Sequence, residues 1–258
     1  MDTRFWGPSG WRLLHSITFA YNPRTDKSDT RIAFEMLPFV LPCKFCRASL
    51  QDYMEKDPLE PALESRDTLT RWLWRIHNEV NAKLRSQNTP VDLDPSFKQV
   101  VLFYEDLLST GCTQIEFPGW DFLFSIADLH PMSNLVKKSI PMPGAPPCDA
   151  MRSAEEKNKW NCLKPEERLP LYNSFWNHIG LILPFKEWRK SWIQPDVKDL
   201  QTRNTTMKWL WSARCAMERD LELLNSCKYS HLCKTLQTHR SGCSKSKRAK
   251  TCRKTRKR

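Results

Sequence analysis

Three short patches in the first 81 residues constrain the fold of this 258-residue chain, because each lies on what the sequence predicts to be a separate helix. The patches are Trp-Gly-Pro-Ser-Gly-Trp-Arg-Leu-Leu-His at 6–15, Cys-Lys-Phe-Cys at 43–46 and His-Asn-Glu-Val-Asn at 77–81. No alternating pattern typical of strands runs for more than a few residues. The chain has only seven glycines and no G-x-G-x-x-G after a strand, which excludes a Rossmann nucleotide site.

The spacing of apolar residues predicts an all-α fold that begins with a compact helical bundle in residues 1–110. Asn22 and Pro23 end the first helix, and a cap at Asp29 or Thr30 begins the second. The helices expected in the bundle cover residues 9–21, 29–39, 43–54, 66–84 and 97–108.

A second helical region is expected in residues 111–240, after an irregular, proline-rich connector at 141–147. Its expected helices cover residues 155–162, 166–183, 185–193 and 198–227. Six tryptophans are expected to form its core, with a nucleic-acid or partner surface as the alternative. They are Trp160, Trp176, Trp188, Trp192, Trp209 and Trp211.

The net charge of +12 is concentrated at the end of the chain, where nine Lys and Arg residues fall between positions 245 and 258 without any acid. A block of like charge this dense predicts a disordered basic tail over residues 241–258. Such a tail either binds nucleic acid or another anionic surface, through release of counterions, or serves only as a solvated tail.

The sequence shows no signal peptide, because Met1–Arg4 leads directly into an amphipathic segment. The apolar runs are interrupted by proline and fall short of the ~20 residues that a membrane-spanning helix needs. We therefore expect a cytoplasmic protein with no membrane span.

The two cysteines Cys43 and Cys46 are three residues apart at a predicted helix start, a spacing that lets a disulfide form and open without large backbone movement. The helix N-terminus and Lys44 both favour a thiolate, the form that takes part in thiol–disulfide exchange. The pattern favours a redox pair. Half of a zinc site and two buried cysteines remain as alternatives, although no second pair of similar spacing lies nearby.

The patch at 77–81 places polar side chains beside a buried stripe, since His77 and Asn81 are one helical turn apart and Asn78 lies on the adjoining side. Amides and imidazoles at such a boundary require hydrogen-bond partners, and a flat heteroaromatic ligand such as adenine would supply them. The alternative for His77 is an ordinary histidine at the core edge. Trp11 and His15, four residues apart, are by default core and boundary residues.

Taken together, the motifs Trp-Gly-Pro-x-x-Trp-x-x-Leu-His, Pro-Cys-x-x-Cys and His-Asn-x-Val-Asn resemble those of the Erv/ALR family of FAD-linked sulfhydryl oxidases, over about residues 1–100. The resemblance implies a four-helix bundle plus a short fifth helix, FAD at the mouth of the bundle, and a homodimer. It implies that Cys46 is the flavin-proximal sulfur and that Cys43 exchanges with incoming thiols. The FAD contacts that it implies are Gly7, Pro8, Trp11, His15, Cys46, His77, Asn78, Val80, Asn81 and Lys83.

The activity implied by the resemblance is an FAD-dependent thiol oxidase that forms disulfides in protein substrates and reduces O2 to H2O2 through the Cys-x-x-Cys disulfide. The extension from Phe117 is similar to that of sulfhydryl oxidases of large DNA viruses, which would place the protein in the host cytoplasm or the virion. Cellular members often carry a structural disulfide just after the third motif, whereas the next cysteine here is Cys112, so that brace is missing or moved.

The remaining cysteines leave several possibilities open. The candidates for a second, mobile redox pair are Cys227 with Cys233 and Cys243 with Cys252. A zinc site formed by cysteines 227, 233 and 243 with His239 and His231 competes with that interpretation, as do structural cysteines. At the level of function, the alternatives to an oxidase are a zinc- or nucleic-acid-binding helical protein with structural cysteines and a flavin-free disulfide isomerase.

Overall fold

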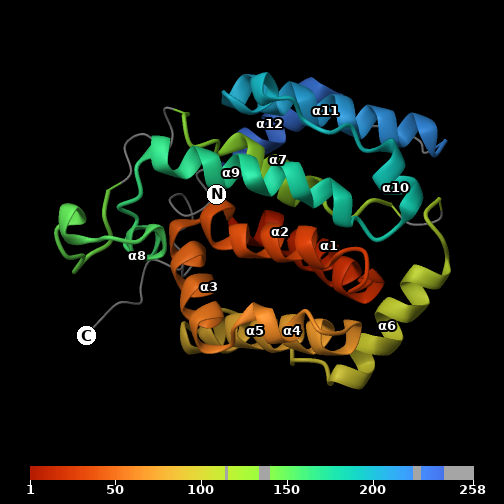
Figure 1. Cartoon of the computed structure of the whole chain (residues 1–258), viewed down its shortest axis with the longest axis horizontal. Helices are drawn as coiled ribbons and strands as arrows, with labels where there is room; N and C mark the ends of the chain where they lie inside the picture. Colours follow the sequence, from red (N-terminus) through yellow and green to blue (C-terminus); the bar gives the residue numbers. More distant parts are fainter. Residues whose placement is uncertain (114–115, 134–139, 223–227, 241–258) are drawn as a thin grey trace.

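The computed structural model describes residues 1–113, 116–133, 140–222 and 228–240. Within these ranges the chain forms helices and no strand, so the predicted all-α class is confirmed. Figure 1 shows two helical layers, with the first five helices in one and most of the later helices in the other. The predicted basic tail, residues 241–258, lies outside the described residues.

The N-terminal region contains the expected bundle, with four long helices and a fifth that follows them along the chain. These are α1 (Thr3–Ala20), α2 (Lys27–Val40), α3 (Lys44–Lys56), α5 (Arg66–Ser86) and α6 (Phe97–Ser109). A one-turn helix, α4 (Leu59–Ala62), was not predicted.

Two helix starts differ from the predictions. Helix α1 begins at Thr3 rather than Ser9, because the side chain of Asp2 caps it by accepting from the Arg4 backbone N–H at 3.0 Å, and Pro8 is tolerated inside the helix. Helix α2 begins at Lys27, so the predicted cap at Asp29 or Thr30 is wrong. Asp26 occupies the cap position, but its carboxylate pairs with Arg189 of the second region at 3.0 Å instead of capping the helix.

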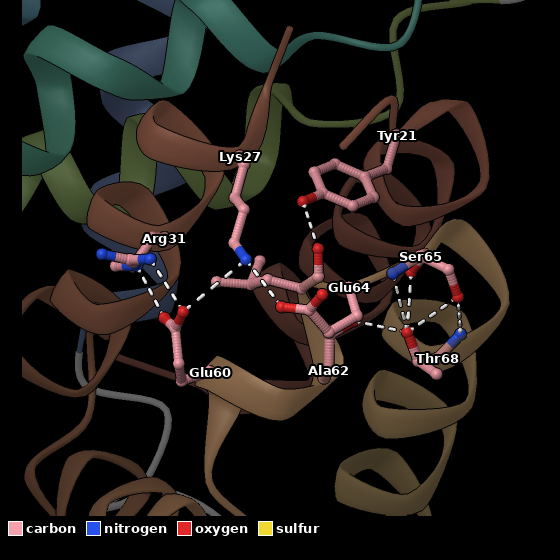
Figure 2. Close-up of polar contacts among 9 residues, drawn as sticks. Tyr21, Lys27, Arg31, Glu60, Ala62, Glu64, Ser65 and Thr68 are labelled. Carbon is pink, nitrogen blue, oxygen red and sulfur yellow. Dashed lines mark hydrogen bonds and ion pairs between the residues drawn. The ribbon is translucent and has the colours of Figure 1, made fainter. Parts of the chain in front are cut away.

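The short helix α4 and the start of α5 are fastened to α1 and α2 by polar contacts (Figure 2). The Tyr21 hydroxyl donates to the Leu63 carbonyl at 2.8 Å, and Lys27 pairs with Glu64 at 2.7 Å. Ser65 and Thr68 form a reciprocal capping box at the start of α5. These contacts fix the direction in which α5 crosses α1.

Among its described residues, the second region contains six α-helices, of which α7 and α12 were not predicted. The helices are α7 (Trp120–Asp128), α8 (Ala154–Lys159), α9 (Pro165–Ile179), α10 (Lys186–Ser191), α11 (Arg203–Asp220) and α12 (Tyr229–Arg240), with 3-10 turns at Cys148–Ala150, Gly180–Ile182 and Val197–Leu200. The helix predicted for 198–227 is instead a 3-10 turn followed by α11, and positions 223–227 lie outside the described residues. All but one of the residues from Trp120 to Asp128 are buried, so α7 has no exposed polar face to give an amphipathic signal.

One continuous apolar core runs through both regions. Helix α9 packs along α2, and α7 packs along α1. Of the six tryptophans, four are buried as predicted and two, Trp160 and Trp211, are only partly buried. The packing is tight at Gly180, where a Cβ atom would lie 2.2 Å from the Trp192 ring.

The last described helix returns to the start of the chain. The ring of His239 on α12 stacks on Phe5 at a centroid distance of 4.2 Å, and the His239 carbonyl accepts from the Asp2 backbone N–H at 3.0 Å. The carboxylate of Asp128, which is fully buried, binds Arg203 at 2.9 Å and Arg240 at 2.6 Å. No helix in the described part of the chain is long and apolar enough to cross a membrane.

Candidate functional site

The cysteine pair lies at the N-terminus of α3, as the sequence predicted. Cys43 is the cap residue, and its sulfur accepts from the backbone N–H of Cys46 at 3.3 Å. Both side chains are partly buried and pack against the common core. A helix N-terminus favours negative charge, so this position favours the thiolate that disulfide exchange requires.

Arg47, which sequence reasoning missed, follows the pair directly. Its guanidinium donates to the Leu41 carbonyl at 2.9 Å and to Asn161 Oδ1 at 2.9 Å, while its buried Nε has no hydrogen-bond partner. Burial lowers the pKa of Arg47, whereas the charges of Cys43 and Cys46 raise it. The only sequence signal was a basic residue next to the motif.

Aromatic rings from three helices meet between α1 and α5, and we call them the ring cluster: Trp11, His15, His77 and Tyr104. Trp11 stacks on His77 at a centroid distance of 3.9 Å with 11° between the planes. His15 Nε2 lies 3.2 Å from His77 Nδ1, a hydrogen bond whose donor depends on the tautomer. Tyr104 of α6 stacks on His15 at 5.2 Å. The structure thus brings together Trp11, His15 and His77, and it adds Tyr104, which the sequence analysis did not single out.

The two histidines of the ring cluster favour the neutral form. Burial lowers the pKa of His15 to about 3, with a further contribution from His77. Burial lowers the pKa of His77 to about 4, against a small opposing effect of Asp94. A neutral imidazole offers one donor and one acceptor. Because His15 Nδ1 is buried without a hydrogen-bond partner, the cluster retains an unused polar atom.

The other predicted residues of α5 are distributed along its last two turns. Asn81 donates to Asp94 Oδ1 at 2.7 Å, and Lys83 donates to Ser49 of α3. Val80 packs against the core, and Asn78 is partly buried beside it. Lys83 therefore ties α5 to the helix that carries the cysteine pair.

Gly7 and Pro8 lie in the first turns of α1, one turn before Trp11. A Cβ atom at Gly7 would meet no other atom within 4 Å, and Pro8 is exposed. Both residues lie on α1, as Trp11 and His15 do, but neither belongs to the ring cluster.

The cysteines of the second region form one disulfide that sequence reasoning missed, Cys148–Cys162, which closes the segment around α8. Cys112 is a free thiol whose carbonyl accepts from Trp188 Nε1 at 3.1 Å. The proposed shuttle residues Cys227, Cys243 and Cys252 lie outside the described residues, and Cys233 lies on α12. Within the ranges that the structure describes, no three potential ligands are gathered for a metal ion.

The comparisons with known proteins concern the N-terminal region. Residues 8–100 match the model of the Erv1 / Alr family. The chain is 38% identical over 85 residues to a probable FAD-linked sulfhydryl oxidase of Acanthamoeba polyphaga mimivirus, covering 31% of this chain and 59% of the relative. It is 34% identical over 87 residues to the mitochondrial FAD-linked sulfhydryl oxidase ERV1 of Saccharomyces cerevisiae, covering 33% of this chain and 45% of the relative.

A putative FAD-linked sulfhydryl oxidase of Invertebrate iridescent virus 3 is 29% identical over 87 residues, covering 33% of this chain and 59% of the relative. The chain thus spans about half the length of the curated relatives that it matches. No solved structure matches the chain significantly. The match at 8–100 contains the cysteine pair and the ring cluster apart from Tyr104.

Proposed function

We propose, from the Erv1/Alr membership of residues 8–100, that this chain is an FAD-dependent thiol oxidase in which Cys43 and Cys46 are the redox pair. The observation that carries the proposal is the arrangement within this matched stretch. A cysteine pair begins α3, and a cluster of stacked, neutral aromatic rings lies between α1 and α5.

The residues present fit a flavin nucleotide. A flat heteroaromatic ring needs stacking surfaces and hydrogen-bond partners, and the ring cluster supplies both through Trp11, His77 and the unpaired Nδ1 of His15. A further unpaired buried atom, Oε1 of Gln51, lies on α3. The proposed contacts are those of the sequence analysis: Gly7, Pro8, Trp11, His15, Cys46, His77, Asn78, Val80, Asn81 and Lys83.

In the proposed reaction, a substrate thiolate attacks Cys43 of the Cys43–Cys46 disulfide, which forms a mixed disulfide and releases Cys46 as a thiolate. A second substrate thiolate then attacks the substrate sulfur of the mixed disulfide, which forms the product disulfide and releases Cys43 as a thiolate, so that both electrons remain on the reduced pair. Bound FAD supplies the electron acceptor that restores the pair to a disulfide and the route to O2, with H2O2 as the product. The α3 N-terminus and the adjacent cations Lys44 and Arg47 favour the thiolates that these exchanges need.

Protein thiols are the proposed substrates, and a homodimer is the proposed assembly. The basic residues from 245 to 258 support contact with nucleic acid or another anionic surface, which would weaken steeply as salt is raised. The cytoplasmic or virion location stays a prediction.

Purified protein tests the proposal directly. We expect a yellow preparation whose flavin spectrum is bleached by dithiothreitol without oxygen and which consumes oxygen with it. Cys46→Ser should retain FAD but lose oxygen consumption, whereas Cys112→Ser, a matched change at a thiol outside the pair, should retain both. Colourless protein that consumes no oxygen, or a Cys46→Ser variant with full oxygen consumption, would refute the assignment.

A further inference from the structure

The segment that leads into the cysteine pair is held by side chains from the second region. Asn158 donates to the Pro38 carbonyl at 2.8 Å, and Arg168 donates to the Phe39 carbonyl at 2.9 Å. Arg168 also binds Asn158 at 3.1 Å, so the two act together. The last carbonyls of a helix have no partner within it, and donors from another element satisfy them here at the end of α2.

The same region fixes the guanidinium that follows the pair. Asn161, between α8 and α9, accepts from Arg47 Nη2 at 2.9 Å and donates to the Ile140 carbonyl at 2.9 Å. Asn161 has a positive backbone φ of 58°. Asparagine tolerates this left-handed backbone conformation better than most residues do. Arg47 is thereby held at one end by Leu41, just before the pair, and at the other by the second region.

The guanidinium of Arg47 is not fully hydrogen-bonded. Its Nε–H is buried and has no partner, and the guanidinium interacts electrostatically with both Cys43 and Cys46. A buried donor without a partner is costly, and a neighbouring thiolate would satisfy both this donor and its charge.

Both cationic and anionic groups lie around the segment that carries the pair. Lys44 donates to the Ile140 carbonyl at 3.2 Å, and the amino group of Met1 donates to the Pro42 carbonyl at 3.3 Å. Arg168 of α9 adds a buried cation that acts on Arg47. Tyr53 of α3 is influenced by the pair as well. Its pKa is raised to about 12, mainly by burial and also by Glu79, Asp52 and Cys46. Of the carboxylates on α3, Asp52 and Glu55 pair with Lys159.

We propose that Arg47, oriented by Asn161 of the second region, stabilises the thiolates of Cys43 and Cys46 and so tunes the reactivity of the redox pair. The equilibrium concerned is loss of a proton from each thiol to water, and the nearby cation favours the charged product. The role of the thiolates in turnover rests on the proposed oxidase function. The acid–base effect itself needs neither flavin nor oxygen. Arg47 and Asn161 are positioning residues for the pair.

The test is the pH dependence of alkylation by iodoacetamide in the reduced full-length chain, read by mass spectrometry. Trypsin cleaves after Lys44, so Cys43 and Cys46 fall in different peptides and are followed separately. Arg47→Met should raise the thiol pKa by about one unit, which slows alkylation about tenfold at pH values below both pKa values. Arg47→Lys, which retains the charge, should recover most of the rate. The matched control is Arg71→Met, which removes a surface cation paired with Asp67.

A second variant keeps the proposal testable if Arg47→Met folds poorly. Asn161→Gly removes the side chain that holds Arg47 while suiting the positive φ, and it should shift the profile in the same direction by a smaller amount. Unchanged profiles in both Arg47→Met and Asn161→Gly would overturn the proposal. If the profiles shift but the protein binds no FAD, the proposed oxidase function fails and this inference stands.

Discussion

The N-terminal region, residues 1–110, contributes the reacting groups of the candidate site, and the second region, residues 111–240, contributes contacts that hold them. The first contains all three motifs, the cysteine pair and the whole family match at 8–100. The second lies outside that match, yet its side chains hold the end of α2, Arg47 and Asp26. The motifs thus identify the reacting groups, whereas the second region, which contains none of the three motifs, positions them.

The largest expected effect breaks ion pairs within the second region at Asp128, which hold α12, the helix that packs against the start of α1. This carboxylate is fully buried and binds Arg203 and Arg240, so Asp128→Ala leaves two cations without their partner. We expect a loss of about 3–5 kcal/mol in the free energy of unfolding. Chemical denaturation measures this loss, and Asp67→Ala, which removes an exposed carboxylate paired with Arg71, is the control. Equal stability of the two variants would mean that the buried pair does not fasten α12.

The disulfide Cys148–Cys162 tests how far the second region depends on its own cross-link. Replacing both cysteines by alanine removes a bridge across a sequence separation of 14. By the chain-entropy argument this costs about 3 kcal/mol of stability. The comparison is thermal unfolding of the double variant against the wild type under non-reducing conditions. A melting temperature that does not fall would show that the packing of α8 on α3 suffices without the bridge.

The histidines of the ring cluster should make the stability of the chain depend on pH. Because burial lowers the pKa of His15 to about 3 and that of His77 to about 4, the unfolded chain binds protons at these sites more readily than the folded one. Their contribution to stability is complete above pH ~6.5 and falls as the pH drops below it, by about 1.4 kcal/mol per pH unit for each histidine down to its folded pKa.

Urea denaturation between pH 7 and pH 4.5 measures this slope. Replacing His77 by glutamine should remove the share of one histidine. Burial also lowers the pKa of His130 in the second region, so part of the slope should remain in a variant that lacks both ring-cluster histidines. A slope that does not change in the His77→Gln variant would contradict burial of this ring.

The smallest expected effect concerns the basic tail. Deleting residues 245–258 should leave the oxidation of a small thiol such as dithiothreitol unchanged, because no motif of the N-terminal region lies there. Oxygen consumption at saturating thiol is the measurement. A large loss of turnover in the truncated chain would assign the tail to the catalytic machinery.

Much of the fold was predictable because the periodic apolar residues of an amphipathic helix lie only a few positions apart in the sequence. The bundle helices were found, and α5 begins at the predicted Arg66 and extends two residues past the predicted end. The helix α7 was missed because nearly all of its side chains are buried, and the cap of α2 was missed because Asp26 binds a residue 163 positions away. Helix propensity and the periodicity of apolar residues depend on neighbours in the sequence, so they cannot predict a contact between residues 163 positions apart.

In the candidate site, too, the motif residues were predicted, and the residues placed by long-range packing were not. Trp11, His15 and His77 were singled out as motif residues, and they do meet, since helical periodicity places each on the inward face of its helix. Tyr104, Arg47 and Asn161 were not singled out. A tyrosine, an arginine and an asparagine have no distinctive pattern in the sequence, and only the packing of α6 and of the segment between α8 and α9 against the motif helices gives them a role.

The sequence by itself determined the helical class, the cysteine pair at a helix start and the likeness of residues 8–100 to one family, because these depend on side chains a few positions apart. Only the tertiary structure decided which rings touch, how the guanidinium of Arg47 is held beside the pair and how the second region holds the segment that leads into the pair. Those features depend on groups far apart in the sequence, 62 positions for His15 and His77 and 114 for Arg47 and Asn161, and a folded chain is needed to bring them within hydrogen-bond distance.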